Sequence, residues 1–384
     1  MKQNNIFFRY FSPVAAQQKL YVAALVALLS SSAYEAEAQV GEPFIHDPST
    51  IALCDGKYYT FGTGEGGIWS EDGWTWQGGA VRPGRGAAPD VLKIGDRYLV
   101  AYSATGGGLG GSHRGDVLTM WNKTLDPKSP DFKYTEPVVV ASSLDDEDCD
   151  AIDAGLLLDP TTGRLWLSYG TYFGFIRLVE LDPKTGKRME GNEPVNIAID
   201  CEATDLIYRN GWYYLLGTHG TCCDGPNSTY NIVVGRSRKI TGPYVDNVGR
   251  EMLQGGGKMV IAANNLKTGP GHFGRYIEEE GVEKMSFHYE SDFRQGGRSV
   301  LAIRPLLWKN DWPVAGDEFH ANSSRAATSS ISPASLAQPS SLRHSDASSQ
   351  PLSLQFLWLS RRLSARRYSL RFRTTACVCC STCL

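Results

Sequence analysis

Three carboxylic acids, Asp47, Asp153 and Glu202, each begin a segment of the same kind. A short apolar strand follows the acid, then a turn that contains glycine, then a strand of alternating aromatic residues. A fourth such segment begins at Asp90, and a weaker fifth one begins at His272. Carboxyl groups gathered at one place disfavour each other's ionised forms, so such a cluster is costly unless it carries out chemistry.

The repeated segments predict how the chain brings these acids together. Repeats with irregular spacing are typical of a β-propeller whose blades carry insertions. In a propeller, the innermost strand of every blade starts at one end of the central channel. The five copies therefore predict an all-β fold, a five-bladed β-propeller, whose five initial residues converge at that end of the channel.

Carboxyl groups in different protonation states can hydrolyse a glycosidic bond with inversion. A carboxylate activates a water molecule and a carboxylic acid protonates the leaving oxygen, the two being about 6.5–9.5 Å apart in such enzymes. A third carboxylate raises the pKa of the acid through like-charge repulsion. Aromatic side chains such as Tyr172 and Phe173 offer stacking faces for sugar rings.

Each acid also has an ordinary structural interpretation. An aspartate in a turn before a strand is common, because its side chain bonds to nearby backbone groups. The repeat favours a functional interpretation for Asp47, Asp153 and Glu202, since it places them at equivalent blade positions. For Asp90 two roles stay open, a hydrogen bond to substrate and bracing of the inner strand.

Composition excludes several classes of function. The formal net charge of -3 gives no electrostatic reason to expect a nucleic-acid partner. The sequence contains neither a glycine-rich phosphate loop nor zinc-finger spacing.

The N-terminal segment has the pattern of a secretory signal peptide. Basic residues precede an apolar run at Leu20–Leu29, and Ala36–Ala38 fits a cleavage site. The run is too short to span a bilayer, which takes about 20 apolar residues. We therefore expect residues 1–38 to be a signal peptide, no membrane association, and a secreted protein, extracellular or periplasmic.

The rest of the chain divides into a catalytic domain and a tail. The pattern of short strands and tight turns predicts one propeller domain over residues 39–319. Beyond Gly316 the chain contains no glycine and no lysine, while serine and arginine dominate. Residues 320–384 are predicted to form a disordered tail without site residues, and a frameshift would also explain the abrupt change.

The cysteines are interpreted for an oxidising compartment. Cys222 and Cys223 are adjacent and form either a vicinal disulfide or two separate thiols. Cys149 and Cys201 could pair across neighbouring blades, although sequence does not fix connectivity. Cys54 is expected to be a thiol in the core.

Several motifs in a fixed order resemble glycoside hydrolase family 43, and within it the arabinanases and arabinofuranosidases. The motifs are H-D-P-S at His46–Ser49, A-P-D-V at Ala88–Val91, A-I-D at Ala151–Asp153, the run Cys222–Ser237 and G-P-G-H at Gly269–His272. The family fold, a five-bladed propeller, agrees with the repeats. The resemblance implies hydrolysis of α-L-arabinofuranosidic bonds with inversion.

The resemblance also implies roles for individual residues. Asp47 becomes the general base, Glu202 the general acid, and Asp153 the residue that orients the acid and raises its pKa. His272 matches a histidine near a calcium ion in the channel. The expected substrate-binding residues are His46, Asp90, Tyr172 and Phe173.

The expected substrate is α-1,5-linked arabinan of plant cell walls or its arabinose-containing oligosaccharides. The resemblance implies first an arabinan endo-1,5-α-L-arabinosidase. An exo-acting α-L-arabinofuranosidase or a β-xylosidase is an alternative within the family, and a glycan-binding propeller without activity is a further one. Endo or exo action depends on loops such as the glycine-rich segment 106–111.

Overall fold

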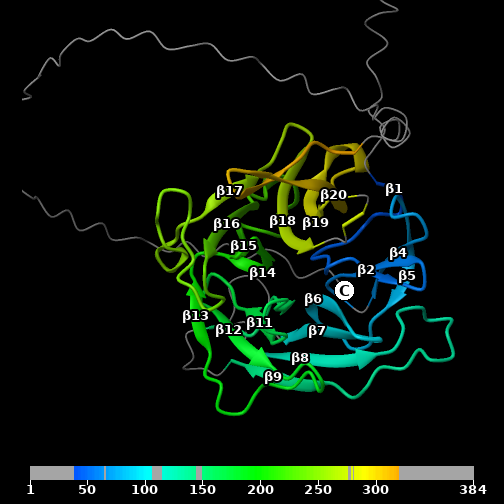
Figure 1. The fold of residues 1–384 in the computed structure, drawn as a ribbon. Coiled ribbons are helices and arrows are strands. Elements are labelled where there is room, and N and C mark those ends of the chain that lie inside the picture. The colour runs from blue at the N-terminus through cyan, green and yellow to red at the C-terminus, as the bar shows by residue number, and fades with distance from the viewer. Residues whose placement is uncertain are drawn as a thin grey trace, which may run out of the picture. The chain divides into compact units, whose positions relative to one another are not determined.

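The computed structural model describes residues 39–64, 66–105, 115–143, 149–275, 278–279 and 281–319. The predicted signal peptide, the glycine-rich loop and the predicted tail lie outside these residues. Nearly all described elements are strands, and they form five sheets around a common centre (Figure 1). The predicted all-β fold, a five-bladed β-propeller, is confirmed.

Each sheet is one blade, and four of the five blades consist of consecutive antiparallel strands. The first blade, in the order β1-β5-β4-β3-β2, comprises β1 (Val40–Gly41), β2 (Ala52–Cys54), β3 (Lys57–Phe61), β4 (Gly66–Ser70) and β5 (Thr75–Val81). The second blade comprises β6 (Ala87–Ile94), β7 (Arg97–Thr105), β8 (Gly115–Asn122) and β9 (Val138–Ser142). The third blade comprises β10 (Gly155–Leu158), β11 (Leu165–Tyr169), β12 (Ile176–Leu181) and β13 (Val195–Ala198). The fourth blade comprises β14 (Glu202–Arg209), β15 (Trp212–His219), β16 (Asn231–Ser237) and β17 (Lys258–Ile261). The fifth blade comprises β18 (Lys267–Arg275), β19 (Lys284–Asp292), β20 (Arg298–Lys309) and β21 (Trp312–Ala315).

Helical structure in the described residues is confined to short 3-10 turns. They are η1 (Gly225–Asn227), η2 (Met252–Gln254) and η3 (Phe293–Gln295). Within the described part of the chain, no helix has the length and apolar character needed to cross a membrane.

The start of the domain joins the first blade to the last. β1 pairs in parallel with β5 of the first blade. The residues that follow run along β20, where the amide of Leu301 donates to the carbonyl of Pro43 at 2.7 Å and Phe44 bridges to Val300. The first and fifth blades are thus held together by backbone hydrogen bonds.

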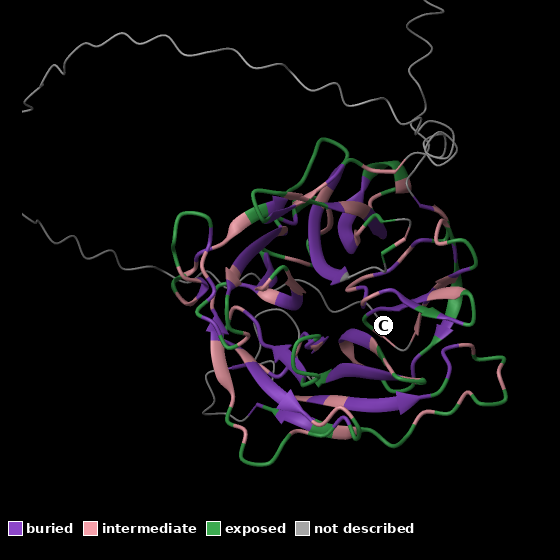
Figure 2. Ribbon diagram, in the orientation of Figure 1, coloured by how far each residue is buried: buried purple, intermediate pink, exposed green. Residues whose placement is uncertain are grey.

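The hydrophobic core lies between neighbouring blades. Figure 2 shows that much of the ribbon of the blade strands is buried. Each of five apolar clusters combines side chains from two adjacent blades. In one of them Leu99 of β7 and Leu167 of β11 are fully buried, and in another Ile68 of β4 joins Leu301 of β20. Each large apolar side chain contributes about 1.5–3 kcal/mol on burial, so these layers fix the blades relative to one another.

A left-handed backbone residue recurs at the channel end of every blade. These residues are Asp47 (φ 51°), Ala88 (φ 45°), Asp153 (φ 59°), Ala203 (φ 49°) and His272 (φ 57°). Positive φ is uncommon for residues other than glycine, and such conformations cluster at functional sites. Three of the five residues that the repeats predicted to converge, Asp47, Asp153 and His272, adopt this conformation themselves.

The predicted equivalence of all four acids is nevertheless wrong in detail. Glu202 lies one residue before the left-handed Ala203, and Asp90 lies two residues after the left-handed Ala88. In both blades the strand register shifts across this turn, between 87 and 90 and between 202 and 205. The fifth blade has the same shift between 271 and 274, yet there the predicted residue, His272, is itself the left-handed one. The repeat therefore located the turn in each blade but not which of its residues adopts the left-handed conformation.

Candidate active site

Asp47 is held from several sides at the channel end of the first blade. Its amide donates to Nδ1 of His288 on β19 at 3.0 Å, and its Oδ2 accepts a hydrogen bond from the hydroxyl of Thr63. The ring nitrogens of two more histidines approach the carboxylate, His46 Nε2 at 3.4 Å from Oδ2 and His272 Nδ1 at 3.4 Å from Oδ1. The Asp47 side chain is therefore oriented by residues from the first and fifth blades.

These contacts decide the charge of Asp47. Burial by itself would raise its pKa, because it removes the carboxylate from water. The charge of His46 and the hydrogen bond and charge of His272 act in the opposite direction, and they hold the pKa of Asp47 well below its ordinary value. Asp47 is therefore ionised at neutral and mildly acidic pH.

Asp153 and Glu202 lie on neighbouring inner segments. Oδ2 of Asp153 accepts the amide of Ala203 at 3.0 Å, which places it beside the residue that follows Glu202. Oε1 of Glu202 accepts a hydrogen bond from the hydroxyl of Tyr230. Asp153 is buried, and Glu202 at the first position of β14 is partly exposed.

The environment of these two acids favours their protonated forms. Burial and the charge of Asp47 raise the pKa of Asp153 to about 8, against the hydrogen bond from Ala203. Burial and the charge of Asp153 raise the pKa of Glu202 to about 8, against the hydrogen bond from Tyr230. The channel end therefore holds one ionised carboxylate together with acids that keep a proton at neutral pH. This division of protonation states suits general acid–base catalysis.

Asp90 has the contacts of a bracing residue. Its Oδ1 accepts the amide of Thr50 at 3.0 Å, and its Oδ2 accepts the amide of Leu156 at 2.9 Å. The side chain is buried, and its two partners belong to the first and third blades. Of the two roles left open for Asp90, the geometry matches the structural one, because both carboxylate oxygens bond to backbone.

The predicted aromatic contacts lie at the same end of the third blade. The hydroxyl of Tyr172 donates to the carbonyl of Thr218 at 2.9 Å, and the hydroxyl of Thr218 accepts the amide of His272. Tyr172 is thereby linked to the residues around Asp47. Phe173 is 61% exposed, so its ring is open to contact with a ligand.

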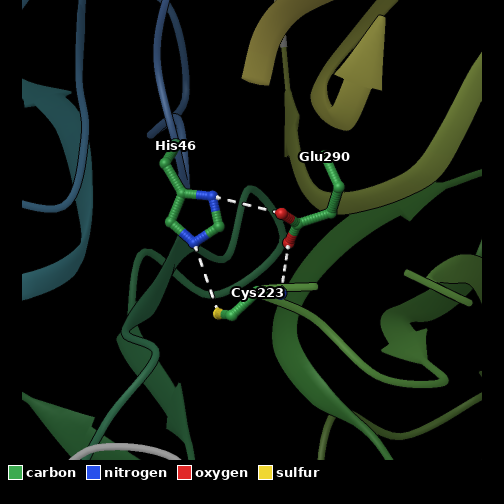
Figure 3. Close-up of side chains that lie close together, drawn as sticks. All are labelled: His46, Cys223 and Glu290. Carbon is green, nitrogen blue, oxygen red and sulfur yellow. Dashed lines mark hydrogen bonds and ion pairs between the residues drawn. The ribbon is translucent and has the colours of Figure 1, made fainter. Parts of the chain in front are cut away.

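His46 lies between the site and a disulfide loop. Its Nδ1 is 3.8 Å from Glu290 Oε2, and its Nε2 is 3.9 Å from Cys223 Sγ (Figure 3). Cys223 is bonded to Cys222, so the vicinal disulfide is present. Cys149 and Cys201 are separate buried thiols, and the alternative of a bond between them is wrong; Cys54 is a buried thiol as expected.

Sequence reasoning missed four residues that contact the acids or their partners. They are Thr63, Tyr230, His288 and Glu290. His288 and Glu290 are two apart on β19, so their side chains share one face of the strand. That spacing predicts that the two side chains lie together, but it does not predict which acid they contact.

The sequence matches the model of the family described as "Glycosyl hydrolases family 43" over residues 40–313. An extracellular exo-α-(1→5)-L-arabinofuranosidase of Cellvibrio japonicus is 30% identical over 333 residues, covering 78% of this chain and 92% of the relative. An extracellular endo-α-(1→5)-L-arabinanase of Bacillus subtilis is 32% identical over 320 residues, covering 76% and 95%. A solved α-L-arabinanase of Cellvibrio cellulosa in complex with arabinohexaose superposes with a TM-score of 0.65 at 28% identity, covering 72% and 96%.

The propeller, the divided protonation of its acids and these similarities together define a glycoside hydrolase. The chain belongs to glycosyl hydrolases family 43, since the family match extends over nearly the whole propeller.

Proposed function

We propose that this enzyme hydrolyses α-1,5-linked arabinan and its oligosaccharides, with inversion at the anomeric carbon. The observation that carries the proposal is the difference in protonation between Asp47, which is ionised, and Glu202, which keeps its proton to about pH 8. An inverting glycosidase requires one carboxyl group in each of these states.

In the proposed reaction, Asp47 accepts a proton from a water molecule as that water attacks the anomeric carbon. Glu202 donates its proton to the departing glycosidic oxygen on the opposite side of the sugar. After one turnover Asp47 is protonated and Glu202 is ionised, and proton exchange with solvent restores both. Tyr230, which donates to Glu202, stabilises the ionised form that the reaction produces.

The other acid assists without a direct role in proton transfer. Asp153 bonds to the backbone next to Glu202, and the negative charge that Asp153 gains as it ionises raises the pKa of Glu202. In this proposal Asp153 orients the segment that carries Glu202 and opposes the loss of the Glu202 proton as the pH approaches 8.

The relatives' names support arabinan as the substrate. They include an endo-arabinanase and an exo-arabinofuranosidase, both with α-(1→5) specificity, and the solved relative binds arabinohexaose. Phe173, which is largely exposed, and His46, which lies against Asp47, are proposed to contact the sugars. Both relatives are described as extracellular, which supports the proposal that this protein is secreted.

Digestion of linear α-1,5-arabinan tests the substrate and the mode of cleavage. Endo action, which we propose, yields a ladder of oligosaccharides on thin-layer chromatography, whereas exo action yields one short product from the start. Activity on a β-xyloside alone would reassign the substrate. If the unmutated protein releases no product from any of these substrates, the glycan-binding alternative is favoured.

The roles of the general acid and the general base can be distinguished by measuring each variant on two substrates whose leaving groups differ in their need for protonation. Glu202→Gln is expected to lower kcat on arabinan by about 10²–10⁴-fold, and by much less on a nitrophenyl arabinofuranoside, whose leaving group needs little protonation. Asp47→Asn is expected to lower kcat on both substrates alike. Glu193→Gln and Asp131→Asn, on exposed residues, serve as matched controls. Similar recovery of both active-site variants on the nitrophenyl substrate would refute the assignment.

The charge of Asp153 predicts a change in pH dependence. Glu202 must be protonated, so activity falls as pH rises through its pKa of about 8. Asp153→Asn removes the repulsion and is expected to move this alkaline limb to lower pH by about one unit. A pH–rate profile of kcat/KM measures the shift. An unmoved limb together with a raised KM would make Asp153 a substrate-binding residue instead.

We also propose a calcium ion near His272. A cavity of about 10 Å³, room for roughly one ion or water, is lined by residues that include His272, Asp90 and Asp205. Calcium prefers six to eight oxygen ligands, so Asp205 and water molecules would supply most of them. The ion would fix the ring of His272 and so support its contact with Asp47.

Chelation tests the calcium proposal. Treatment with EDTA is expected to lower the melting temperature and the activity, and calcium, but not magnesium, is expected to restore both. His272→Ala should remove this response. Protein that contains no calcium by elemental analysis and ignores the chelator would contradict the proposal.

A further inference from the structure

The hydrogen bonds around His288 define its protonation. Its Nδ1 accepts the amide hydrogen of Asp47 at 3.0 Å, so this nitrogen carries no proton. The proton is therefore on Nε2, which lies 3.3 Å from Oε1 of Glu290 and donates to it. Burial, only partly offset by the bond to Glu290, lowers the pKa of His288, which agrees with a neutral ring.

Glu290 is itself held in one orientation. Its Oε1 also accepts the amide of Cys223 at 3.3 Å, and its Oε2 faces His46 Nδ1 at 3.8 Å. The side chain is 4% exposed. Although burial opposes ionisation, the hydrogen bond from His288 and the charge of His46 keep the pKa of Glu290 below its ordinary value. An ionised Glu290 that accepts from Nε2 fixes which nitrogen of His288 faces Asp47.

The backbone of Asp47 needs such a contact. Its left-handed conformation is unfavourable for a residue other than glycine and persists only where the surroundings impose it. His288 is 241 residues away in the chain, on β19 of the last blade. The hydrogen bond therefore fixes Asp47, at the start of the first blade, against β19 of the fifth blade.

A metal-binding interpretation of these side chains fits less well. Two groups of donor atoms lie close enough together to hold an ion, His46 with Cys223 and Glu290, and His46 with Asp47 and His288. The sulfur of Cys223 is bonded to Cys222, and Nδ1 of His288 accepts the amide of Asp47. In each group one donor atom is thus already engaged.

We propose that His288 and Glu290 are positioning residues for Asp47: Glu290 selects the tautomer of His288, and His288 holds the backbone of Asp47 so that its carboxylate faces the attacking water. This inference rests on the proposed function, in which Asp47 is the general base. Neither residue has to touch substrate. Substitution of either residue is therefore expected to lower kcat without a comparable change in KM, and to act only by displacing Asp47.

Two substitutions of His288 distinguish the roles of its two ring nitrogens. Asn places its amide oxygen near the position of Nδ1 and can still accept from Asp47, whereas Gln reaches the position of Nε2 and loses that acceptor. We expect His288→Gln to lower kcat about 10–10²-fold with KM changed less than about threefold, since small misplacements have effects of this size. His288→Asn should keep most of the activity. Equal losses in the two variants would overturn the proposal.

A double-mutant cycle tests whether the effect passes through Asp47. In the Asp47→Asn background, His288→Gln should cause no further loss on the nitrophenyl arabinofuranoside, because the base that it positions is absent. A multiplied loss would show an independent role and would refute positioning. Full activity of Asp47→Asn alone would instead refute the proposed function, so the two failures are distinguishable.

Glu290 supplies a second pair of variants, which keeps the test valid if His288→Gln does not fold by circular dichroism. Glu290→Gln can still accept from Nε2, while Glu290→Met, of similar size, cannot. We expect Gln to retain kcat and Met to lower it about tenfold. Equal kcat in these two folded variants would also overturn the proposal.

Discussion

The structure depends on an electrostatic constraint: three carboxyl groups lie close enough to raise one another's pKa, so they are not all ionised at neutral pH. His46 and His272 lie beside the carboxylate of Asp47 and stabilise its charge, while the neutral ring of His288 accepts its amide hydrogen. At Asp153 and Glu202, burial and the nearby negative charge outweigh the favourable contacts and leave both acids protonated at neutral pH. The functional difference between a base and an acid thus arises from the distribution of histidines around chemically similar groups.

The propeller is the means by which this constraint is imposed. Its apolar side chains lie in layers between neighbouring blades, so the channel itself can be lined by polar groups and backbone. Each blade then contributes one left-handed residue at the channel end. Asp90, deeply buried, ties the first and third blades together through two backbone amides, and it is part of the framework rather than of the chemistry.

Much of this arrangement could be predicted from the sequence. The repeated order of acid, apolar strand, turn and aromatic strand specified the fold, because each repeat encodes one hairpin with a fixed start. The adjacent Cys222 and Cys223 likewise pointed to the disulfide that is present. Asp47, Asp153 and Glu202 are brought close together, so that the charge of Asp47 raises the pKa of Asp153 and the charges of both raise the pKa of Glu202.

The remainder depends on information that a hydrophobic pattern does not contain. The pattern of apolar residues located the inner strands, but it did not distinguish Ala203 from Glu202, or Ala88 from Asp90, as the left-handed residue. The pairing of His288 with Asp47 joins residues 241 positions apart, and it exists only because the ring closes between the first and fifth blades. Strand alternation shows which face a side chain occupies, but the partner on that face depends on how the blades pack.

The central claim is that Asp47 activates water on the side of the sugar opposite to Glu202. The most direct measurement is proton NMR of the anomeric configuration of the first sugar released from an α-L-arabinofuranoside, recorded before mutarotation. The account predicts that the β-anomer appears first and equilibrates afterwards to the mixture. Initial release of the α-anomer would show retention, and it would contradict the assignment of Asp47 as a general base.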